Sequence, residues 1–214
     1  MSEKYFDAQT DSNGHEYIDL GLPSGTLWAT CNIGATTPEE CGNYYAWGET
    51  ITKNIYNWTN YKYSKGDEDE LTKYCNDSDF GNNGFTDNLT DLQRGDDPAT
   101  ANWGSGWQTP SYEQWKELLA NTTNEWTTQN GVKGRLFISK KYGESLFLPV
   151  AGCRWDGYLY DVGWSYGGYW SSSLYTVYPD YAWYFDFDSD CCGMYFDYRF
   201  NGQSVRAVRS AWMQ

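Results

Sequence analysis

The chain has 214 residues, a formal net charge of −14 and a sequence pI near 4.3, and 19% of its residues are aromatic. This length can bury a sizeable core, and so high an aromatic content is atypical of disordered chains. The acidic balance argues against nucleic acid and anionic membranes as partners, because both require a basic face.

Few segments predict helices. Thr37 begins Thr-Pro-Glu-Glu, which offers an N-cap, a proline at the first helical position and a glutamate to complete a capping box. Asp97 begins a second short helical turn in the same manner. The clearest helix covers residues 109–122, where Thr109 or Ser111 caps the start and apolar residues fall on one face.

Most other apolar segments predict short strands, since they are brief and lie between turn-forming residues. They cover residues 16–22, 27–31, 134–139, 145–150, 168–173, 182–188 and 204–209. Few helices, many short strands and long loops predict an α+β fold.

The sequence predicts one domain over residues 15–214 behind a polar tail, residues 1–14. The stretch 76–91 is polar but contains Phe80 and Phe85, so we interpret it as a surface loop and not as a boundary. The N-terminal segment has no apolar stretch of the kind found in secretory signals, and no apolar run of about 18 residues occurs. We therefore expect no signal peptide and no insertion into a membrane.

The six cysteines show no paired spacing, so we expect free thiols and no zinc site. They are Cys31, Cys41, Cys75, Cys153, Cys191 and Cys192. A disulfide between the two adjacent cysteines would be strained.

The last 70 residues differ in composition from the rest. All nine Lys and all eleven Glu lie in residues 1–144, whereas residues 145–214 contain seven Asp and four Arg. Nineteen of the 41 aromatic residues lie from position 151 onward. Met194 and Arg199 are expected scaffold positions, and Arg199, Arg206 and Arg209 are expected to anchor loops through buried hydrogen bonds.

Alternation in residues 182–188 predicts two faces of a strand. Trp183, Phe185 and Phe187 form the expected buried face. The intervening residues form an expected exposed row: Tyr184, Asp186 and Asp188. A Tyr- and Asp-rich surface on a rigid scaffold has the chemistry of an antibody paratope, and large exposed aromatic patches mark binding sites.

Three blocks in order resemble one bacterial family, the Fibrobacter succinogenes major paralogous domain. The blocks are YIDLGLPSGTLWATCNIGATTPEECGNYYAWGET at 17–50, DDPATANWGSGWQTPSYEQWKELL at 96–119, and YWSSSLY, AWYFDF and RFNGQSVRAVR within 169–209. The family is similar to the formylglycine-generating-enzyme branch of the C-type lectin fold. The resemblance therefore implies a C-type lectin-like domain with short antiparallel strands.

Some members of this family are variable proteins of diversity-generating retroelements, in which AAY codons become NNY. Such codons encode Tyr, Asp, Gly, Cys, Phe and Val, among others, but never Lys, Glu, Gln, Met or Trp. The resemblance implies a variable segment at about 155–201, with Trp170, Trp183, Met194 and Gln203 as scaffold. The implied ligand-binding residues are Tyr175, Val177, Tyr178, Asp180, Tyr181, Tyr184, Asp186, Asp188, Asp190, Cys191, Cys192, Gly193, Tyr195, Phe196, Asp197, Tyr198 and Phe200. Candidates for an upstream rim are Tyr160, Asp161 and Tyr166.

Metal binding and catalysis are the alternatives. Asp186, Asp188 and Asp190 alternate along one face and offer oxygen ligands suited to calcium, but EF-hand spacing and lectin calcium triplets are absent. The single histidine, His15, lies in a polar segment, and no hydrolase or P-loop motif occurs. Paired carboxylates of a glycosidase remain compatible with so acidic a chain.

The resulting hypothesis is a non-catalytic, receptor-type protein that displays a diversified Tyr/Asp-rich surface, with no catalytic residues, metal or cofactor. We expect a monomer that binds an unidentified protein or glycan, without nucleic acid, at a cell surface or on a phage tail. The alternative is a carbohydrate-binding or carbohydrate-active protein with a dedicated aromatic/Asp site, with or without calcium.

Overall fold

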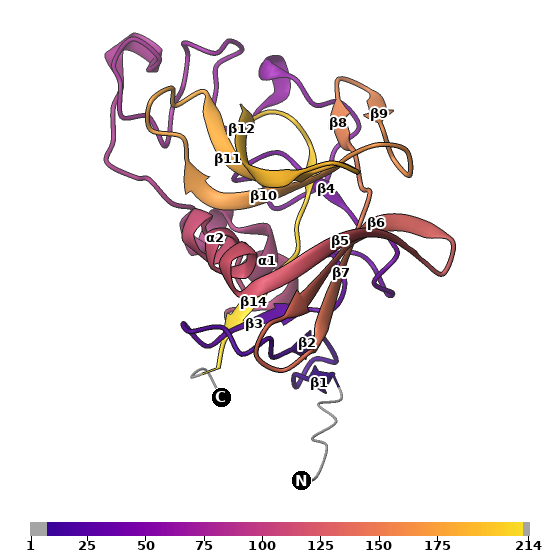
Figure 1. Cartoon of the computed structure of the whole chain (residues 1–214). Helices are drawn as coiled ribbons and strands as arrows, with labels where there is room; N and C mark the ends of the chain where they lie inside the picture. The colour runs from indigo at the N-terminus through magenta and orange to yellow at the C-terminus, as the bar shows by residue number, and fades with distance from the viewer. Residues whose placement is uncertain (1–7, 212–214) are drawn as a thin grey trace, which may run out of the picture.

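The computed structural model describes residues 8–211, which form an α+β fold (Figure 1). Its strands are β1 Gln9–Thr10, β2 Glu16–Ile18, β3 Thr26–Ala29, β4 Tyr44–Tyr45, β5 Thr122–Gln129, β6 Val132–Ser139, β7 Ser145–Pro149, β8 Cys153–Trp155, β9 Tyr158–Tyr160, β10 Gly167–Leu174, β11 Tyr181–Phe187, β12 Cys192–Tyr198, β13 Gln203–Ser204 and β14 Val208–Ser210. Its helices are α1 Pro98–Trp103 and α2 Tyr112–Asn121, with 3₁₀ turns η1 Trp58–Asn60, η2 Asn82–Gly84 and η3 Arg94–Asp96. The predicted fold class is confirmed at this level.

The described strands form four sheets, ordered β1-β2-β3-β14, β12-β11-β10-β13-β4, β5-β6-β7 and β8-β9. The pairs are antiparallel except β10 with β13. In Figure 1 both ends of the described chain lie beside the first sheet, whereas β11, β12 and the β8–β9 hairpin lie at the opposite end. No helix within residues 8–211 is long and apolar enough to span a bilayer.

Both helices begin at the predicted caps. The Asp97 carboxylate accepts a hydrogen bond from the backbone N–H of Ala99 at 2.8 Å, which starts α1. Ser111 and Gln114 form a reciprocal capping box at the start of α2. Helix α2 then packs its buried Trp115 against the five-stranded sheet.

The helix expected from Thr37 is wrong, because this segment forms a turn. The Glu40 carboxylate accepts hydrogen bonds from the backbone N–H groups of Thr36 and Thr37, as in a capping box. Gly42 then takes a φ of 69°, and a Cβ there would lie 2.5 Å from the Ile33 carbonyl oxygen. This close approach turns the chain toward β4, so no helix follows the cap.

Strand β5 was not predicted, although the chain carries a signal for it. Asn130 and Gly131 both have positive φ, 49° and 85°, and join β5 to β6 in a two-residue hairpin. Asn-Gly is the preferred pair for such a turn. The strand predicted at 204–209 is instead divided between β13 and β14, which belong to different sheets.

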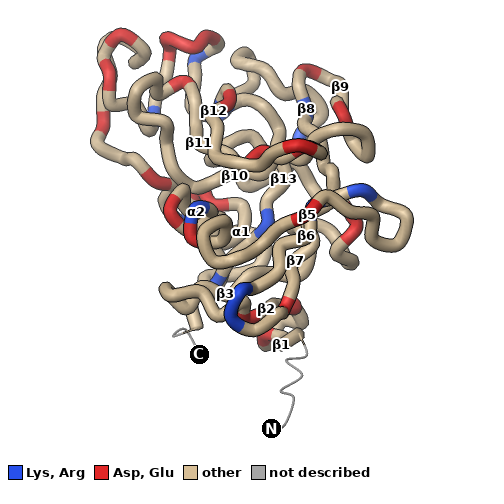
Figure 2. The backbone as a smooth tube through the Cα atoms, in the orientation of Figure 1, with Lys and Arg blue, Asp and Glu red and all other residues tan. Residues whose placement is uncertain are grey.

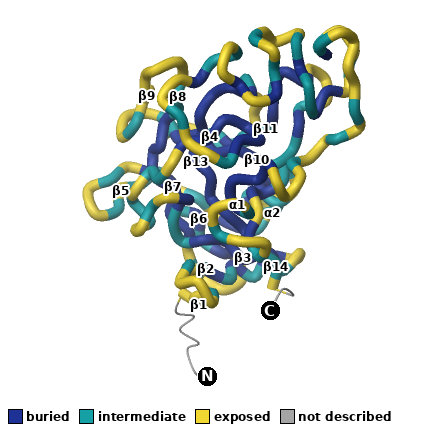
Figure 3. The backbone as a smooth tube through the Cα atoms, turned by 180° about the vertical axis from the view of Figure 1, so that it is seen from behind, coloured by how far each residue is buried: buried dark blue, intermediate teal, exposed yellow. Residues whose placement is uncertain are grey.

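Two aromatic-rich clusters form the core of the described chain. Phe185 of β11 stacks on Trp115 at 4.6 Å in one cluster, which also contains Phe137. The other cluster lies around Trp47 and Trp170. Figure 3 shows buried backbone through the interior and exposed backbone in the peripheral loops.

Candidate ligand-binding surface

The antiparallel pair β11–β12 forms one edge of the five-stranded sheet and has two different faces. Phe185 and Phe187 are buried as predicted, and Met194 packs against them from β12. Trp183, expected to be buried with them, is half-buried and contacts Tyr112 at 4.6 Å. This face therefore contributes to the core, except at Trp183.

The other face of β11 was expected to carry an exposed row of side chains, and this prediction is wrong. Tyr184 and Asp186 are half-buried, and the Tyr184 hydroxyl donates to Asp186 at 3.0 Å. Asp188 lies beyond β11 and accepts hydrogen bonds from the backbone N–H groups of Asp190 and Cys191, which closes the turn into β12. Distant segments cover this face, and local alternation contains no information about them.

The seventeen predicted site residues divide into three groups by exposure. Exposed are Val177, Tyr178, Asp190, Cys191, Tyr195 and Phe196. Half-buried are Tyr175, Tyr181, Tyr184, Asp186, Asp188, Cys192, Gly193, Asp197 and Tyr198. Buried are Asp180 and Phe200, and Cys192 packs against the core, so these three side chains support the surface and do not present themselves to a ligand.

Aromatic residues from separate segments meet at the C-terminal end of β12. Tyr175 stacks on Phe196 with ring centroids 4.3 Å apart, and Tyr181 stacks on Tyr198 at the same separation. Tyr178 extends this group toward Phe80 of the preceding long loop. Stacking holds the rings in defined positions while part of each remains accessible.

The β8–β9 hairpin carries a second set of exposed apolar side chains. Trp155, Tyr158, Leu159 and Tyr160 are all exposed, and Trp164 follows with 77% of its surface accessible. Only Tyr160 of these was a candidate. Asp156-Gly157 is the turn signal that predicts this hairpin, and the surrounding aromatic residues mark its exposure as unusual. NNY codons do not encode Trp, so the two exposed tryptophans depart from the pattern implied for the variable segment.

A group of polar side chains lies between the hairpin base and the β11–β12 face, and we call it the polar floor. Its members are Cys153, Tyr166, Tyr184, Asp186, Asp197 and Gln203. Asp197 accepts hydrogen bonds from Gln203 Nε2 at 2.7 Å and from Asn201 Nδ2 at 2.8 Å. Tyr166 donates to Gln203 Oε1 at 3.4 Å. These contacts connect β12 to the segment that leads into β13.

Both carboxyl groups of the polar floor have raised pKa values. Burial raises the pKa of Asp186 to about 6, and the charges of Asp188 and Asp197 contribute in the same direction. Burial likewise raises the pKa of Asp197. Within residues 8–211, no Lys or Arg forms an ion pair with either group. The floor is therefore acidic without a cation to balance it.

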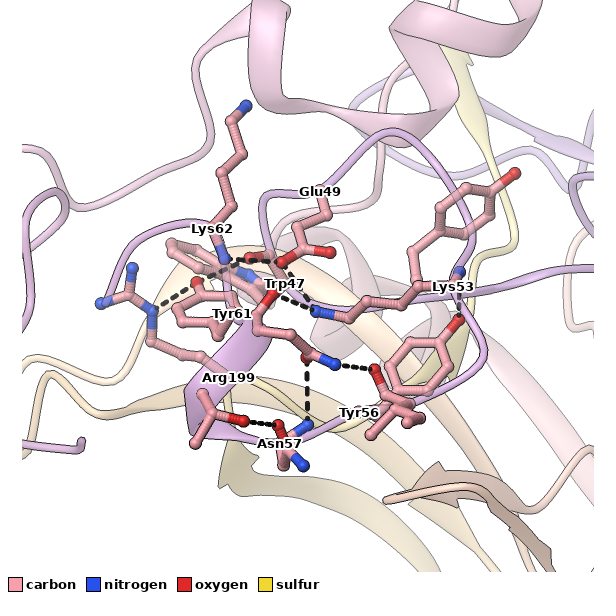
Figure 4. A network of polar contacts seen from close by, with 12 residues as sticks. Trp47, Glu49, Lys53, Tyr56, Asn57, Tyr61, Lys62 and Arg199 are labelled. Atoms are coloured by element: carbon pink, nitrogen blue, oxygen red, sulfur yellow. Dashed lines mark hydrogen bonds and ion pairs between the residues drawn. The ribbon is translucent and has the colours of Figure 1, made fainter. Parts of the chain in front are cut away.

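Arg199, immediately after β12, fastens this surface to the scaffold (Figure 4). Its guanidinium is fully buried and donates to the Tyr61 hydroxyl at 3.0 Å and to the carbonyl oxygens of Lys73, Tyr74 and Pro179 at 2.9, 3.0 and 2.8 Å. The loop that precedes α1 is thereby joined to the end of β12. The expected anchoring role of this arginine is confirmed.

Arg206 is anchored in the same way, through Asn32 Oδ1 at 2.8 Å and the carbonyl oxygens of Ala29 and Thr30. Arg209 lies 4.0 Å from Asp11 at the opposite end of the fold. Neither arginine belongs to the surface around the polar floor.

The cysteines are all free, and their thiols form no disulfide in the described chain. Between residues 8 and 211, no three His, Cys, Asp or Glu side chains are placed so that they could hold a metal ion. The three alternating aspartates considered for calcium are separated, because Asp186 lies in the polar floor and Asp188 closes a turn.

The chain has no match among protein-family models, curated proteins or solved structures.

Proposed function

We propose that this chain is a non-catalytic ligand-binding protein with a C-type lectin-like fold, and that it displays a surface diversified by a retroelement. One observation carries the proposal. Nine of the thirteen large apolar side chains that are exposed in the described chain lie within residues 155–196. Exposed aromatic groups concentrated on one part of a soluble protein are typical of binding sites.

The division between scaffold and surface supports this proposal. Trp170 and Gln203, which NNY codons do not encode, are buried, and Met194 packs against the core. Val177, Tyr178, Tyr195 and Phe196, which NNY codons do encode, are exposed. Buried residues that NNY codons do not encode thus alternate along the chain with exposed residues that they do encode, as expected for a fixed frame with replaceable side chains. Tyrosine on such a frame provides contact area at low entropic cost.

The position of the surface also suits recognition. The two ends of the described chain lie at the end of the fold opposite β12 and the β8–β9 hairpin (Figure 1). Attachment through either end leaves the aromatic surface unobstructed. We therefore infer that its ligand is a protein or glycan on another surface.

A display experiment tests the proposal. Four exposed positions, Val177, Tyr178, Tyr195 and Phe196, are randomised with NNY codons, and the library is selected on a panel of immobilised proteins and glycans. We expect folded variants that bind saturably and leave the ligand unchanged. A matched library randomises four exposed positions elsewhere: Glu113, Lys116, Ala120 and Glu125. Binders recovered equally often from both libraries would contradict the proposal.

A further inference from the structure

No Lys or Arg of the described chain pairs with the carboxylates of the polar floor. Arg135, the basic side chain at the neighbouring turn, donates instead to the carbonyl oxygens of Asp188 and Cys191 at 2.7 and 3.0 Å. The titratable groups that influence Asp186 come from β8, β11, β12 and the turn between the last two strands. They are Cys153, Tyr184, Asp188, Tyr195 and Asp197. All of them are acidic or neutral, and none can balance the carboxylate charge.

Arginines of the C-terminal third do not supply the missing charge. Arg199 and Arg206 are fully buried in hydrogen bonds to carbonyl and side-chain oxygens elsewhere. Arg154 lies over the ring of Tyr44 at 5.3 Å. The fourth arginine, Arg209, lies 4.0 Å from Asp11 at the other end of the fold, and residues 145–214 contain no Lys. Figure 2 shows acidic residues along the loops at this end of the fold.

The geometry leaves access to Asp186, whereas Asp197 already accepts hydrogen bonds from the side chains of Asn201 and Gln203 and from the backbone N–H of Tyr198. Asp186 pairs across the strands with Gly193, which has no side chain to cover it. Asn201 donates to Asp197, while its own Oδ1 is buried without a hydrogen-bond partner. Tyr195, next on the same face of β12 as Gly193, is exposed. A donor group from outside would thus meet a carboxylate beside an aromatic ring, an arrangement that stabilises cations.

Resting on the proposed function, we propose that the partner is a protein segment that places a Lys or Arg side chain on Asp186, beside the exposed ring of Tyr195. A basic side chain complements the acidic floor, whose carboxylates have no paired cation. The net charge of −14 on the whole chain also favours a basic partner. The ring of Tyr195 lies over Gly193, next to Asp186, and shields one side of the ion pair from water, which strengthens it. A glycan or a neutral peptide lacks this charge.

A random cyclic-peptide library, displayed on phage, provides the probe. It is selected at pH 7.5 on the full chain immobilised through its C-terminus. The peptides kept for study bind the parent chain but not the double variant Tyr158→Ser/Tyr195→Ser. We expect a Lys or Arg at one fixed position of these peptides. Replacing it with Gln should weaken binding by tenfold or more, and Asp186→Asn should weaken it by a similar factor. The control Glu113→Gln/Glu125→Gln, which removes two charges elsewhere, should change affinity less than twofold.

The pH dependence gives a readout that needs no altered protein. Since the pKa of Asp186 lies near 6, protonation at pH 5 removes the attraction, and affinity should fall between pH 7.5 and pH 5. Surface-binding peptides without a basic residue, bound equally at both pH values, would overturn this inference and leave the proposed function intact. Failure to obtain any peptide that depends on Tyr158 and Tyr195 would overturn both.

Discussion

Replacing Arg199 with Met should destabilise the fold strongly. The guanidinium makes four hydrogen bonds, to Tyr61 and to the backbone of Lys73, Tyr74 and Pro179, at 2.8–3.0 Å. Met fills much of the volume but donates nothing, so four buried acceptors lose this partner at about 1 kcal/mol each. Relief from burying a charge offsets part of this loss, which leaves a net destabilisation of about 3 kcal/mol.

Urea denaturation followed by tryptophan fluorescence measures this change, and the midpoint of thermal unfolding should fall by roughly 6–12 °C. Arg199→Lys keeps the charge but lacks the planar set of donors, so it should lose at least half as much stability. Arg94 is exposed, and Arg94→Met is the matched control, expected to stay within about 0.5 kcal/mol of the parent. If Arg199→Met also unfolds within about 1 kcal/mol of the parent, the anchoring role assigned to Arg199 is wrong.

Three further perturbations test other parts of the structure. Phe185→Ala removes a buried ring stacked on Trp115 and should cost about 3–5 kcal/mol in urea denaturation, whereas an unchanged midpoint would contradict the packing of α2 on the sheet. Gly131→Val places a β-branched residue at a φ of 85° and should destabilise the chain by at least about 1 kcal/mol, with Gly106→Val, which has open space, as the comparison. Asp186→Asn should stabilise the protein at pH 8 by about 1–2 kcal/mol, a value reduced for the solvent screening of a half-buried group, and should have little effect at pH 3. The pKa of Asp186 is raised on folding, so its charge opposes folding once the pH exceeds its unfolded pKa, and equal effects at both pH values would refute the assigned burial.

The parts of the fold that could be predicted from the sequence are those with local causes. Asp97 and Ser111 start helices through hydrogen bonds to residues two and three positions away. The same local logic fails at Thr37, because a glycine that follows must approach a distant carbonyl. At Asn130-Gly131 the cause is again local, because both residues take a positive φ and close the β5–β6 hairpin.

Burial along the candidate surface could be predicted from the sequence only in part. Alternation along β11 correctly places Phe185 and Phe187 in the core. It does not reveal the partial burial of Tyr184 and Asp186, because the side chains near them include Cys153 and Tyr166, which come from segments before β10. Phe200 lies outside regular strands, where alternation does not apply, and it packs on Trp58 in the core.

Deep sequencing of this gene from a natural population tests the central claim most directly. The account predicts substitutions concentrated at adenine-derived positions of codons for the exposed residues of 175–200, with Trp183, Met194 and Arg199 unchanged. Variation spread evenly along the gene, or substitutions at Arg199 as frequent as those at Tyr195, would contradict a diversified surface on a fixed scaffold.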